Sequence, residues 1–296
     1  MRENVWTRER ALLLLPALLV LALVVVLPIT RVVQLSLSRV ELQEGIVARW
    51  AGVEQFARLW QDGRWWAALR NTAVFTGASV ALEMGLGIAF ALLLHRRFRG
   101  RGGVRALVML PWALPTAVMA LAWAWIFNDA FGVLNDLLRR AGFVGSPIAW
   151  LGDPGTAMLA LVIADVWKTT PFVMLIVLAG LQAIPEQVLE AARVDGLSAW
   201  QRLRRVVLPL LVPSLLVALA FRTVQAYGAF DLPYVMTGGG PGGSTETVSL
   251  LAYQNYFRYL EFGYGSAVAV QGVVLVVLLA VAVMAVADVR RRKGGA

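Results

Sequence analysis

Long apolar stretches, separated by short charged segments, dominate this chain of 296 residues. The first stretch, from Ala11 to Thr30, has the roughly 20 residues that a helix needs to cross a ~30 Å hydrocarbon layer. Five more stretches follow, at 71–94, 106–128, 157–182, 206–235 and 267–287. The pattern predicts an all-α integral membrane protein with six transmembrane helices.

The Lys and Arg residues are concentrated in every second connecting segment. Segments 1–10, 96–105, 183–205 and 288–296 hold 3, 5, 4 and 4 of them. The longer segments 34–70, 129–156 and 237–263 hold 5, 2 and 1. Because basic residues flank membrane spans on the cytoplasmic side, both termini are predicted to be cytoplasmic.

This topology divides the chain into four parts. They are a cytoplasmic N-terminal tail (1–10), the first transmembrane helix with an external segment (11–70), a core transmembrane domain (71–287) and a basic cytoplasmic tail (288–296). The external segment holds four tryptophans between Trp50 and Trp66, which favours amphipathic pieces at the membrane interface.

Composition excludes several kinds of function. The chain has no cysteine and one histidine, so we expect no disulfide, no thiolate or histidine-cluster metal site and no Ser-His-Asp triad. The net charge of +9 comes from basic runs at the ends of spans, which indicates membrane topology and not nucleic-acid binding. The protein is therefore not expected to be an enzyme.

Small residues recur at four-residue intervals along the second span. They are Ala73, Gly77, Ala81, Gly85 and Ala89. Such a ridge lets another helix approach closely, which predicts a packed bundle and not six independent anchors.

Charged side chains occupy the middle of three predicted spans, at Glu83, Lys168 and Arg222. A charge at that depth is costly, so it is usually either paired or functional. One interpretation is a salt-bridge network, with Asp165 as a further partner, that only holds helices together. The other is a pathway whose side chains hydrogen-bond a polar solute.

Aromatic residues accompany these charges. Trp167 and Tyr227 lie deep in the same spans, whereas Trp112 and Trp125 are typical of membrane interfaces. A sugar presents hydroxyls to polar groups and C–H faces to aromatic rings, so this mixture suits a sugar. The candidate pathway residues are Glu83, Trp167, Lys168, Arg222, Tyr227 and Asp231.

A charged segment, EAARVDGLSAW (190–200), interrupts the apolar pattern between the fourth and fifth spans. Pro185 is typical of a helix start, and Asp195-Gly196 is typical of a turn. Ser198 and Gln201 match a capping box for a second helix. The local pattern predicts two short helices joined by a turn, and an ordinary solvated loop explains it equally well.

The same segment carries the pattern E-A-A-x-x-x-G followed by L-P, which resembles the EAA loop of binding-protein-dependent ABC importer permeases. The residues are Glu190, Ala191, Ala192, Gly196, Leu208 and Pro209. NTAVFT (71–76), VWKTTPF (166–172), FRTVQAYGAFDLPYVMTGGGP (221–241) and LAYQNYF (251–257) are similar to the sugar-permease branch of that family. The extra N-terminal spans and large external domain of maltose-type subunits are missing, so the chain looks more like compact six-span subunits, including those for trehalose.

The resemblance implies a type I ABC importer fold with a cytoplasmic coupling helix in segment 185–209. The residues that would contact the ATP-hydrolysing partner are Glu190, Ala191, Ala192, Asp195 and Gly196. Further implied partners are a second homologous permease in a heterodimer, two ATPase subunits that bind ATP and Mg, and an extracytoplasmic solute-binding protein. The chain itself is expected to bind membrane lipid but no cofactor and no nucleic acid, and to lie in the cytoplasmic (inner) membrane.

The glycine-rich stretch GGGPGGST (238–245) is similar to a Walker A loop, but Ser244 stands at the lysine position and no parallel strand precedes it. It is therefore predicted to be a tight external turn that closes the fifth span. In the resembling family this turn lies where the permease meets its binding protein. Candidate docking residues are Gly238, Gly239, Gly240 and Pro241.

The sequence therefore predicts the permease subunit of an ATP-driven importer for a sugar, with a di- or oligosaccharide favoured. A polyol, glycerol phosphate or an amino acid remains an alternative substrate. An ion-coupled secondary transporter is a further alternative, which would show internal repeats and would give the EAA loop no role.

Overall fold

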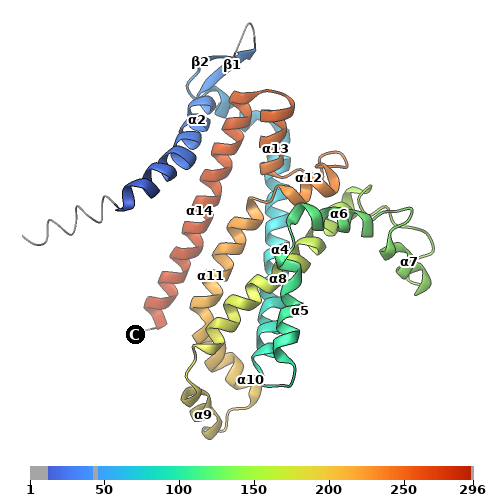
Figure 1. The fold of residues 1–296 in the computed structure, drawn as a ribbon, viewed down its shortest axis with the longest axis vertical. Helices are drawn as coiled ribbons and strands as arrows, with labels where there is room; N and C mark the ends of the chain where they lie inside the picture. The colour runs from blue at the N-terminus through green and yellow to red at the C-terminus, as the bar shows by residue number, and fades with distance from the viewer. Residues whose placement is uncertain (1–12, 43–45, 295–296) are drawn as a thin grey trace, which may run out of the picture. The chain divides into compact units, whose positions relative to one another are not determined.

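A computed structural model of the chain describes residues 13–42 and 46–294. The predicted N-terminal tail (1–10) lies outside these residues. Within them, five helices are long and apolar enough to cross a membrane, and a sharply bent helix pair supplies a sixth span. The predicted helical membrane class is therefore confirmed, and the contacts divide the chain into two compact units (Figure 1).

The smaller unit comprises Met1–Trp65 and Leu251–Val273. Its elements are η1 (Ala22–Val26), α2 (Leu27–Ser36), β1 (Ser38–Leu42), β2 (Ile46–Trp50), α3 (Glu54–Gln61) and η3 (Gln254–Arg258), with parts of α4, α13 and α14. The first span, Leu13–Ser36, buries none of its most apolar window, so its surface suits a lipid environment. The antiparallel β1–β2 hairpin, which pairs Ser38 with Trp50, was not predicted from the sequence.

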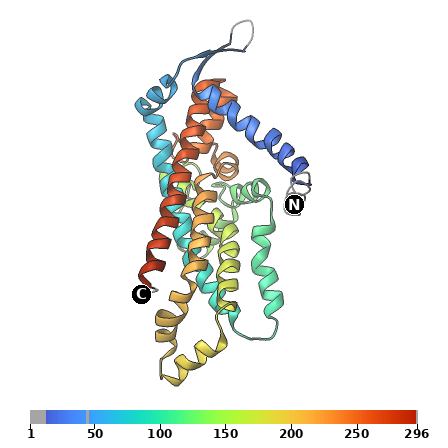
Figure 2. The ribbon, with the colours of Figure 1, turned by 90° about the vertical axis from the view of Figure 1, so that its left-hand side faces the viewer.

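The larger unit comprises Trp66–Leu250 and Val274–Ala296. Its elements are α4 (Gly63–His95), α5 (Arg101–Ala113), α6 (Thr116–Ile126), α7 (Val133–Arg140), α8 (Pro154–Gln182), α9 (Glu186–Val194), α10 (Ala199–Arg202), η2 (Leu203–Val207), α11 (Leu208–Tyr227), α12 (Asp231–Thr237), α13 (Val248–Tyr253) and α14 (Phe262–Gly294). The span helix α8 packs against α5 and α11 (Figures 1 and 2).

Two apolar clusters form the core of the larger unit. The Phe75 cluster contains Phe75, Val80, Met119, Ala120, Phe127, Ala160, Leu161, Val162, Ala164, Val166, Ala226, Leu232 and Met236. The Met174 cluster contains Ala91, Leu94, Val173, Met174, Val177, Leu178, Leu181, Leu211 and Ala218. Both clusters draw on α4, α8 and α11, so these three helices share one packed interior with two layers.

Close packing of these helices depends on glycines outside the predicted small-residue ridge. A Cβ added at Gly87 of α4 would lie 2.6 Å from Val173 Cγ1 of α8. A Cβ at Gly180 of α8 would lie 2.3 Å from the hydroxyl of Ser214. Gly77 and Gly85, which belong to the predicted ridge, have no such neighbour within 4 Å among the described residues. Within this chain, the helices therefore approach each other closely at Gly87 and Gly180, and not at the glycines of the predicted ridge.

The third span is not the straight helix predicted over 106–128. It consists of α5 and α6, which meet at an angle of 93°. Leu114, the residue between them that precedes Pro115, is extended (φ −74°, ψ 139°). A proline disfavours helical geometry in the residue before it, so α5 ends at Ala113 and Pro115 takes the N-cap position of α6.

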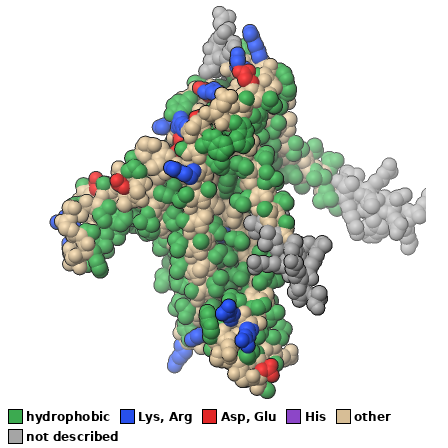
Figure 3. Space-filling view, turned by 180° about the vertical axis from the view of Figure 1, so that it is seen from behind, with side chains coloured by type: hydrophobic (Ala, Val, Ile, Leu, Met, Phe, Trp, Pro, Cys, Tyr) green, Lys and Arg blue, Asp and Glu red, His purple; other side chains and the backbone are tan. Residues whose placement is uncertain are grey.

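The fifth span also ends earlier than predicted. α11 stops at Tyr227 instead of continuing to Val235, and a separate helix, α12, begins at Asp231. The fourth span, in contrast, runs unbroken through Pro171. Apolar side chains cover much of the surface in Figure 3, as expected for a protein with lipid as solvent.

Candidate functional site

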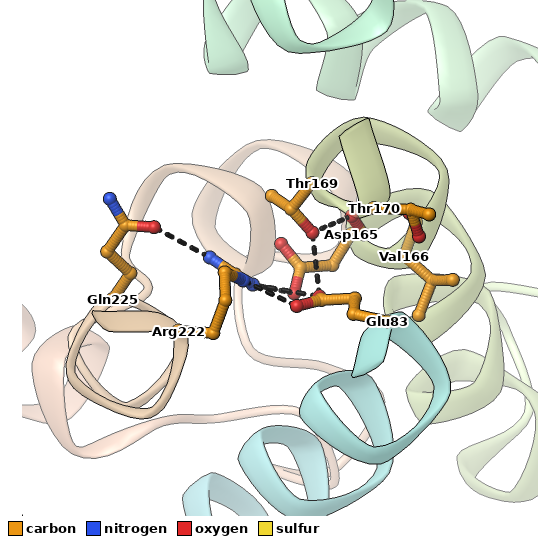
Figure 4. Close-up of polar contacts among 7 residues, drawn as sticks. All are labelled: Glu83, Asp165, Val166, Thr169, Thr170, Arg222 and Gln225. Atoms are coloured by element: carbon orange, nitrogen blue, oxygen red, sulfur yellow. Dashed lines mark hydrogen bonds and ion pairs between the residues drawn. The ribbon is translucent and has the colours of Figure 1, made fainter. Parts of the chain in front are cut away.

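Three charged residues from three helices of the larger unit meet in one buried ion cluster (Figure 4). Glu83 of α4, Asp165 of α8 and Arg222 of α11 have 0%, 9% and 2% of their surface exposed. Arg222 Nη2 lies 2.8 Å from Glu83 Oε1 and 3.1 Å from Asp165 Oδ2, and its Nε donates to Glu83 Oε2. The guanidinium therefore bridges two carboxylates and ties three helices together.

Neutral side chains complete the bonding of this ion cluster. The hydroxyl of Thr169 lies 2.7 Å from Glu83 Oε1, and Arg222 Nη1 donates to Gln225 Oε1 at 2.9 Å (Figure 4). Buried charges are tolerated only when they are paired and hydrogen-bonded, and these partners meet that condition.

The ion cluster lies between the two apolar layers. On α4, Glu83 falls between Val80 of the Phe75 cluster and Ala91 of the Met174 cluster. On α11, Arg222 falls between Ala226 and Ala218 of the same two clusters. Apolar residues therefore flank the charges on both sides along these helices, and the depth near mid-membrane stays a prediction.

A cavity of about 300 Å³ adjoins the ion cluster. It is lined by Trp112, Thr116, Asp165, Lys168, Thr169, Arg222, Gln225, Gly228, Ala229, Phe230, Asp231 and Leu232. Both helix breaks of the larger unit, between α5 and α6 and between α11 and α12, contribute to this lining. Interrupted helices leave backbone groups without helical partners, so such breaks suit a polar cavity at membrane depth.

Lys168 of α8 contacts the backbone at the break between α5 and α6. Its Nζ donates to the backbone oxygen of Leu114 at 2.5 Å, directly at the break between α5 and α6. The ammonium therefore satisfies a carbonyl that the bend has released, and it lines the cavity at the same time. This contact joins α8 to the bent third span.

Three of the six candidate pathway residues line this cavity: Lys168, Arg222 and Asp231. Glu83 does not line it, but it is bonded to Arg222, which does. Trp167 is 43% exposed and meets Trp123 edge-on at 5.7 Å between ring centroids, and it does not line the cavity either.

Several lining residues were missed by the sequence interpretation. Trp112, which we expected at a membrane interface, lines the cavity, together with Thr116 and Gln225. The available signal was Pro115, three residues after Trp112, because a proline predicts a helix end or kink nearby.

The sixth candidate, Tyr227, lines a different feature, a groove of about 670 Å³ between α4 and α11 to which Leu279 of α14 also contributes; we call it the α4–α11 groove. This groove exposes Ala73, Gly77 and Ala81 of the predicted small-residue ridge. The hydroxyls of Thr76 and Tyr227 are buried at the groove and have no hydrogen-bond partner among the described residues. The α4–α11 groove is therefore apolar in the main, with two unsatisfied hydroxyls.

The segment after the fourth span forms the two predicted short helices. α9 ends in a turn at Gly196 (φ +75°), where Gly196 N bonds to Arg193 O at 3.0 Å and Leu197 N to Ala192 O at 3.2 Å. These two bonds are the Schellman pattern of helix ends. The predicted capping box of Ser198 and Gln201 opens α10. The hairpin of helices is therefore built by local hydrogen bonds, and α9 begins one residue after Pro185.

The surface of α9 alternates between burial and exposure. Ala192 is 5% exposed, whereas Val194 is 87% exposed and the carboxylate-bearing Glu190 is also exposed. Ala191 is exposed as well. One face of the short helix therefore rests on its own unit, and the other is free for a partner.

The glycine-rich turn closes α12 and not the fifth span. Gly238 ends α12 in the left-handed conformation (φ 59°). Inside the turn, Thr245 Oγ1 donates to Gly240 O at 2.7 Å, and Asn71 Nδ2 donates to Gly243 O at 2.8 Å. Side chains therefore bind the turn from within and from α4, as expected for a surface with a defined shape.

Comparison with known proteins agrees with this architecture. Residues 83–293 match the family described as binding-protein-dependent transport system inner membrane component. The chain is 42% identical to the trehalose/maltose transport system permease protein MalF of Thermococcus litoralis over 95% of this chain and 94% of that protein. It is 42% identical to the sulfoquinovosyl glycerol transport system permease protein SmoG of Agrobacterium fabrum, over 88% and 83%.

The fold has solved counterparts. A bacterial ABC transporter involved in the import of the acidic polysaccharide alginate matches with a TM-score of 0.83 at 21% identity, over 96% of this chain and 98% of that chain. The architecture is therefore that of the transmembrane subunit of an ABC importer. The chain belongs to the family of inner membrane components of binding-protein-dependent transport systems, which confirms the predicted family, fold and multi-pass membrane location.

Proposed function

We propose that the chain is the permease subunit of an ATP-driven importer that carries a sugar, with a di- or oligosaccharide favoured. The observation that supports this most directly is the cavity at the two helix breaks, because it combines charged, amide and aromatic side chains. Relatives are named as trehalose/maltose and trehalose permeases, the latter being SugA of Mycobacterium tuberculosis at 39% identity.

The lining of this cavity suits a sugar. Lys168, Gln225 and Asp231 offer donors and acceptors for hydroxyl groups. The rings of Trp112 and Phe230 offer faces for C–H groups. The volume of about 300 Å³ is at the lower end of the ~300–1,000 Å³ range of small-molecule sites, so one or two sugar units would occupy it at a time.

The α9 helix would act as the coupling helix. The exposed residues Glu190 and Ala191 would enter a groove of a separate ATPase subunit, which binds ATP and Mg. Ala192, a further predicted contact residue, is 5% exposed and would instead hold α9 against its own unit. Asp195 and Gly196 form the turn that presents the helix. A short rigid helix in a groove transmits a partner's closure into the spans to which it is attached.

The remaining partners and the topology complete the proposal. Both termini would be cytoplasmic, since the basic segments lie on that side. A second homologous permease would cover the α4–α11 groove, and a heterodimer is favoured. An extracytoplasmic solute-binding protein would dock at Gly238, Gly239, Gly240 and Pro241.

Reconstituted uptake tests the proposal. The chain is co-expressed with a second permease, ATPase subunits and a solute-binding protein, placed in vesicles, and given labelled disaccharides, a polyol, glycerol phosphate and an amino acid. ATP-dependent accumulation of a disaccharide supports the proposal. Uptake of another solute class would replace the sugar assignment, and uptake driven by an ion gradient without ATP would overturn the importer.

A pair of substitutions at Gly196 tests the coupling role. At φ +75°, alanine costs about 1–2 kcal/mol in the left-handed region, whereas asparagine visits it routinely. Gly196→Ala should therefore lower transport-coupled ATP hydrolysis, and Gly196→Asn should retain most of it. Equal activity of both variants would contradict a role for this turn in presenting α9.

A further inference from the structure

A second polar cavity, of about 710 Å³, lies beside α9 in the larger unit. The end of α4, the start of α5, the end of α8 and one side of α9 from Glu186 to Arg193 form its walls. Arg97, Arg101 and Arg193 line it together with His95, and Glu186 is the acidic residue in the lining. Figure 3 shows basic side chains on the surface at this end of the molecule. The cavity therefore carries an excess of positive charge.

The arginines of this cavity form no ion pair with another described residue. Across residues 13–42 and 46–294, the ion pairs leave out Arg97, Arg101, Arg193 and Glu186. Arg101 donates to the backbone oxygen of His95 at 3.4 Å, which is a neutral partner. Like charges that line one cavity repel each other, and an anion between them would reverse that repulsion.

The depth of the cavity indicates where such an anion comes from. The spans α4 and α8 end at His95 and Gln182, and both residues line the cavity. It therefore lies at the level where the hydrocarbon layer gives way to lipid headgroups. Apolar side chains, including Leu181, Ile184 and Leu189, form another part of the lining. A lipid presents a phosphate and an apolar portion together, whereas free phosphate has no apolar group that could contact the apolar part of the lining.

We propose that this cavity binds the phosphate headgroup of an anionic phospholipid of the cytoplasmic leaflet. Basic pockets between spans on the cytoplasmic side are suited to such headgroups, and guanidinium groups bind phosphate by paired hydrogen bonds. Arg193 belongs to α9, whereas Arg97 and Arg101 belong to the segment between α4 and α5. One headgroup shared between them ties α9 to the membrane spans. The leaflet and the consequence for transport rest on the proposed function.

Lipid binding to the purified full chain provides the test. Native mass spectrometry from mixed micelles measures retained phosphatidylglycerol and phosphatidylcholine for wild type and for Arg97→Gln with Arg193→Gln. The matched control is Arg204→Gln with Arg205→Gln, which removes the same charge from exposed arginines outside the cavity. We expect phosphatidylglycerol affinity to fall by about tenfold or more in the cavity variant, and by about twofold or less in the control.

Two other outcomes would contradict the proposed lipid site. Equal losses in both variants would show general attraction of anionic lipid to a basic surface, and the site would be rejected. Displacement of the lipid by inorganic phosphate at matched concentration would make it a free-anion site. The binding measurement does not depend on transport. A negative result would therefore contradict the lipid site and leave the proposed function unaffected.

A second measurement addresses the link to α9. ATP hydrolysis by the assembled transporter is compared in phosphatidylcholine vesicles with and without phosphatidylglycerol. Wild type and the control variant should respond to the anionic lipid, and the cavity variant should not. Equal responses of all three proteins would overturn the tie between the headgroup and α9.

Discussion

At the scale of single residues, Arg222 of the larger unit has a predictable effect on stability. It bridges Glu83 and Asp165, both of which are almost completely removed from solvent. Removing one partner of a buried ion pair leaves the other charge uncompensated, which costs about 3–5 kcal/mol. Arg222→Met should therefore lower the thermal stability and the folded yield of the purified permease.

The matched control for this prediction removes charge without leaving carboxylates unpaired. Arg139→Met replaces an exposed arginine of α7. It should change the free energy of unfolding by no more than about 0.5 kcal/mol. Adding Glu83→Gln to Arg222→Met should recover part of the loss, since one buried carboxylate is then neutral. Unfolding that is no easier in Arg222→Met than in Arg139→Met would contradict the structural role of the ion cluster.

Lys168 separates structure from transport at the same site. It is only partly buried, and it donates a hydrogen bond to the carbonyl of Leu114. Lys168→Met keeps the length of the side chain and removes its charge, so assembly should survive. Uptake of the transported sugar should fall by about tenfold or more, because one lost hydrogen bond from a charged donor is worth ~1.5–3 kcal/mol.

Uptake and assembly are therefore measured on the same preparation for the Lys168 variant. Intact assembly with lost uptake assigns Lys168 to the pathway. Failed assembly assigns it to holding α8 against the bent third span, and unchanged uptake with intact assembly removes it from the pathway.

The sequence predicted single site residues correctly where a charged side chain interrupts an apolar span. Glu83, Lys168 and Arg222 stood out because charges are rare in apolar spans, and the structure places Glu83 and Arg222 in contact. Trp112 did not stand out, because a tryptophan suits a membrane interface and a cavity equally well. What distinguishes the two locations is the direction of the backbone, which depends on the bend at Pro115.

At the scale of helices, two glycines of α4 provide a test of packing. Gly87 faces α8, where an added Cβ would meet Val173 Cγ1 at 2.6 Å, whereas Gly85 faces open space. Gly87→Ala should destabilise the fold by about 1–3 kcal/mol through overpacking. Gly85→Ala should be neutral or stabilise it by up to ~1 kcal/mol, since alanine is the better helix former.

Thermal unfolding of the two glycine variants in the same detergent makes this comparison. Both substitutions add one methyl group to one helix, so helix propensity cancels between them. Equal stability of the two variants would mean that α4 and α8 do not approach as closely as the structure shows.

Helices were predictable in number but not in shape. Apolar length identified the spans, because each must bury a continuous polar backbone in lipid. The 93° bend between α5 and α6 and the early end of α11 were missed. Apolar residues continue through both breaks, so hydropathy alone does not register them. Pro115 and Gly228 mark the breaks, but Pro171 lies in an unbroken helix, so proline by itself is not a sufficient signal.

At the scale of the whole molecule, the larger unit exposes a surface that its own helices do not cover. The α4–α11 groove combines small residues with the buried hydroxyls of Thr76 and Tyr227, which have no partner among the described residues. Small residues let the backbone of another helix approach closely, whereas lipid tails gain nothing from such a surface. This contrast favours the second permease as the occupant of the groove.

Gly77→Leu tests this assignment. Gly77 lines the groove, and a Cβ added there has no described neighbour within 4 Å. A leucine at this position is therefore expected to extend into the groove and to exclude a partner helix. Gly103→Leu is the control. Gly103 lies in the first turn of α5, outside the groove, and a Cβ added there also has no described neighbour within 4 Å. Co-purification with the second permease should fall in Gly77→Leu and persist in Gly103→Leu, with both subunits equally stable alone. If both variants retain the partner, the groove faces lipid and the permease pair is formed by another surface; if both lose it, the leucine acts on folding and not on the interface.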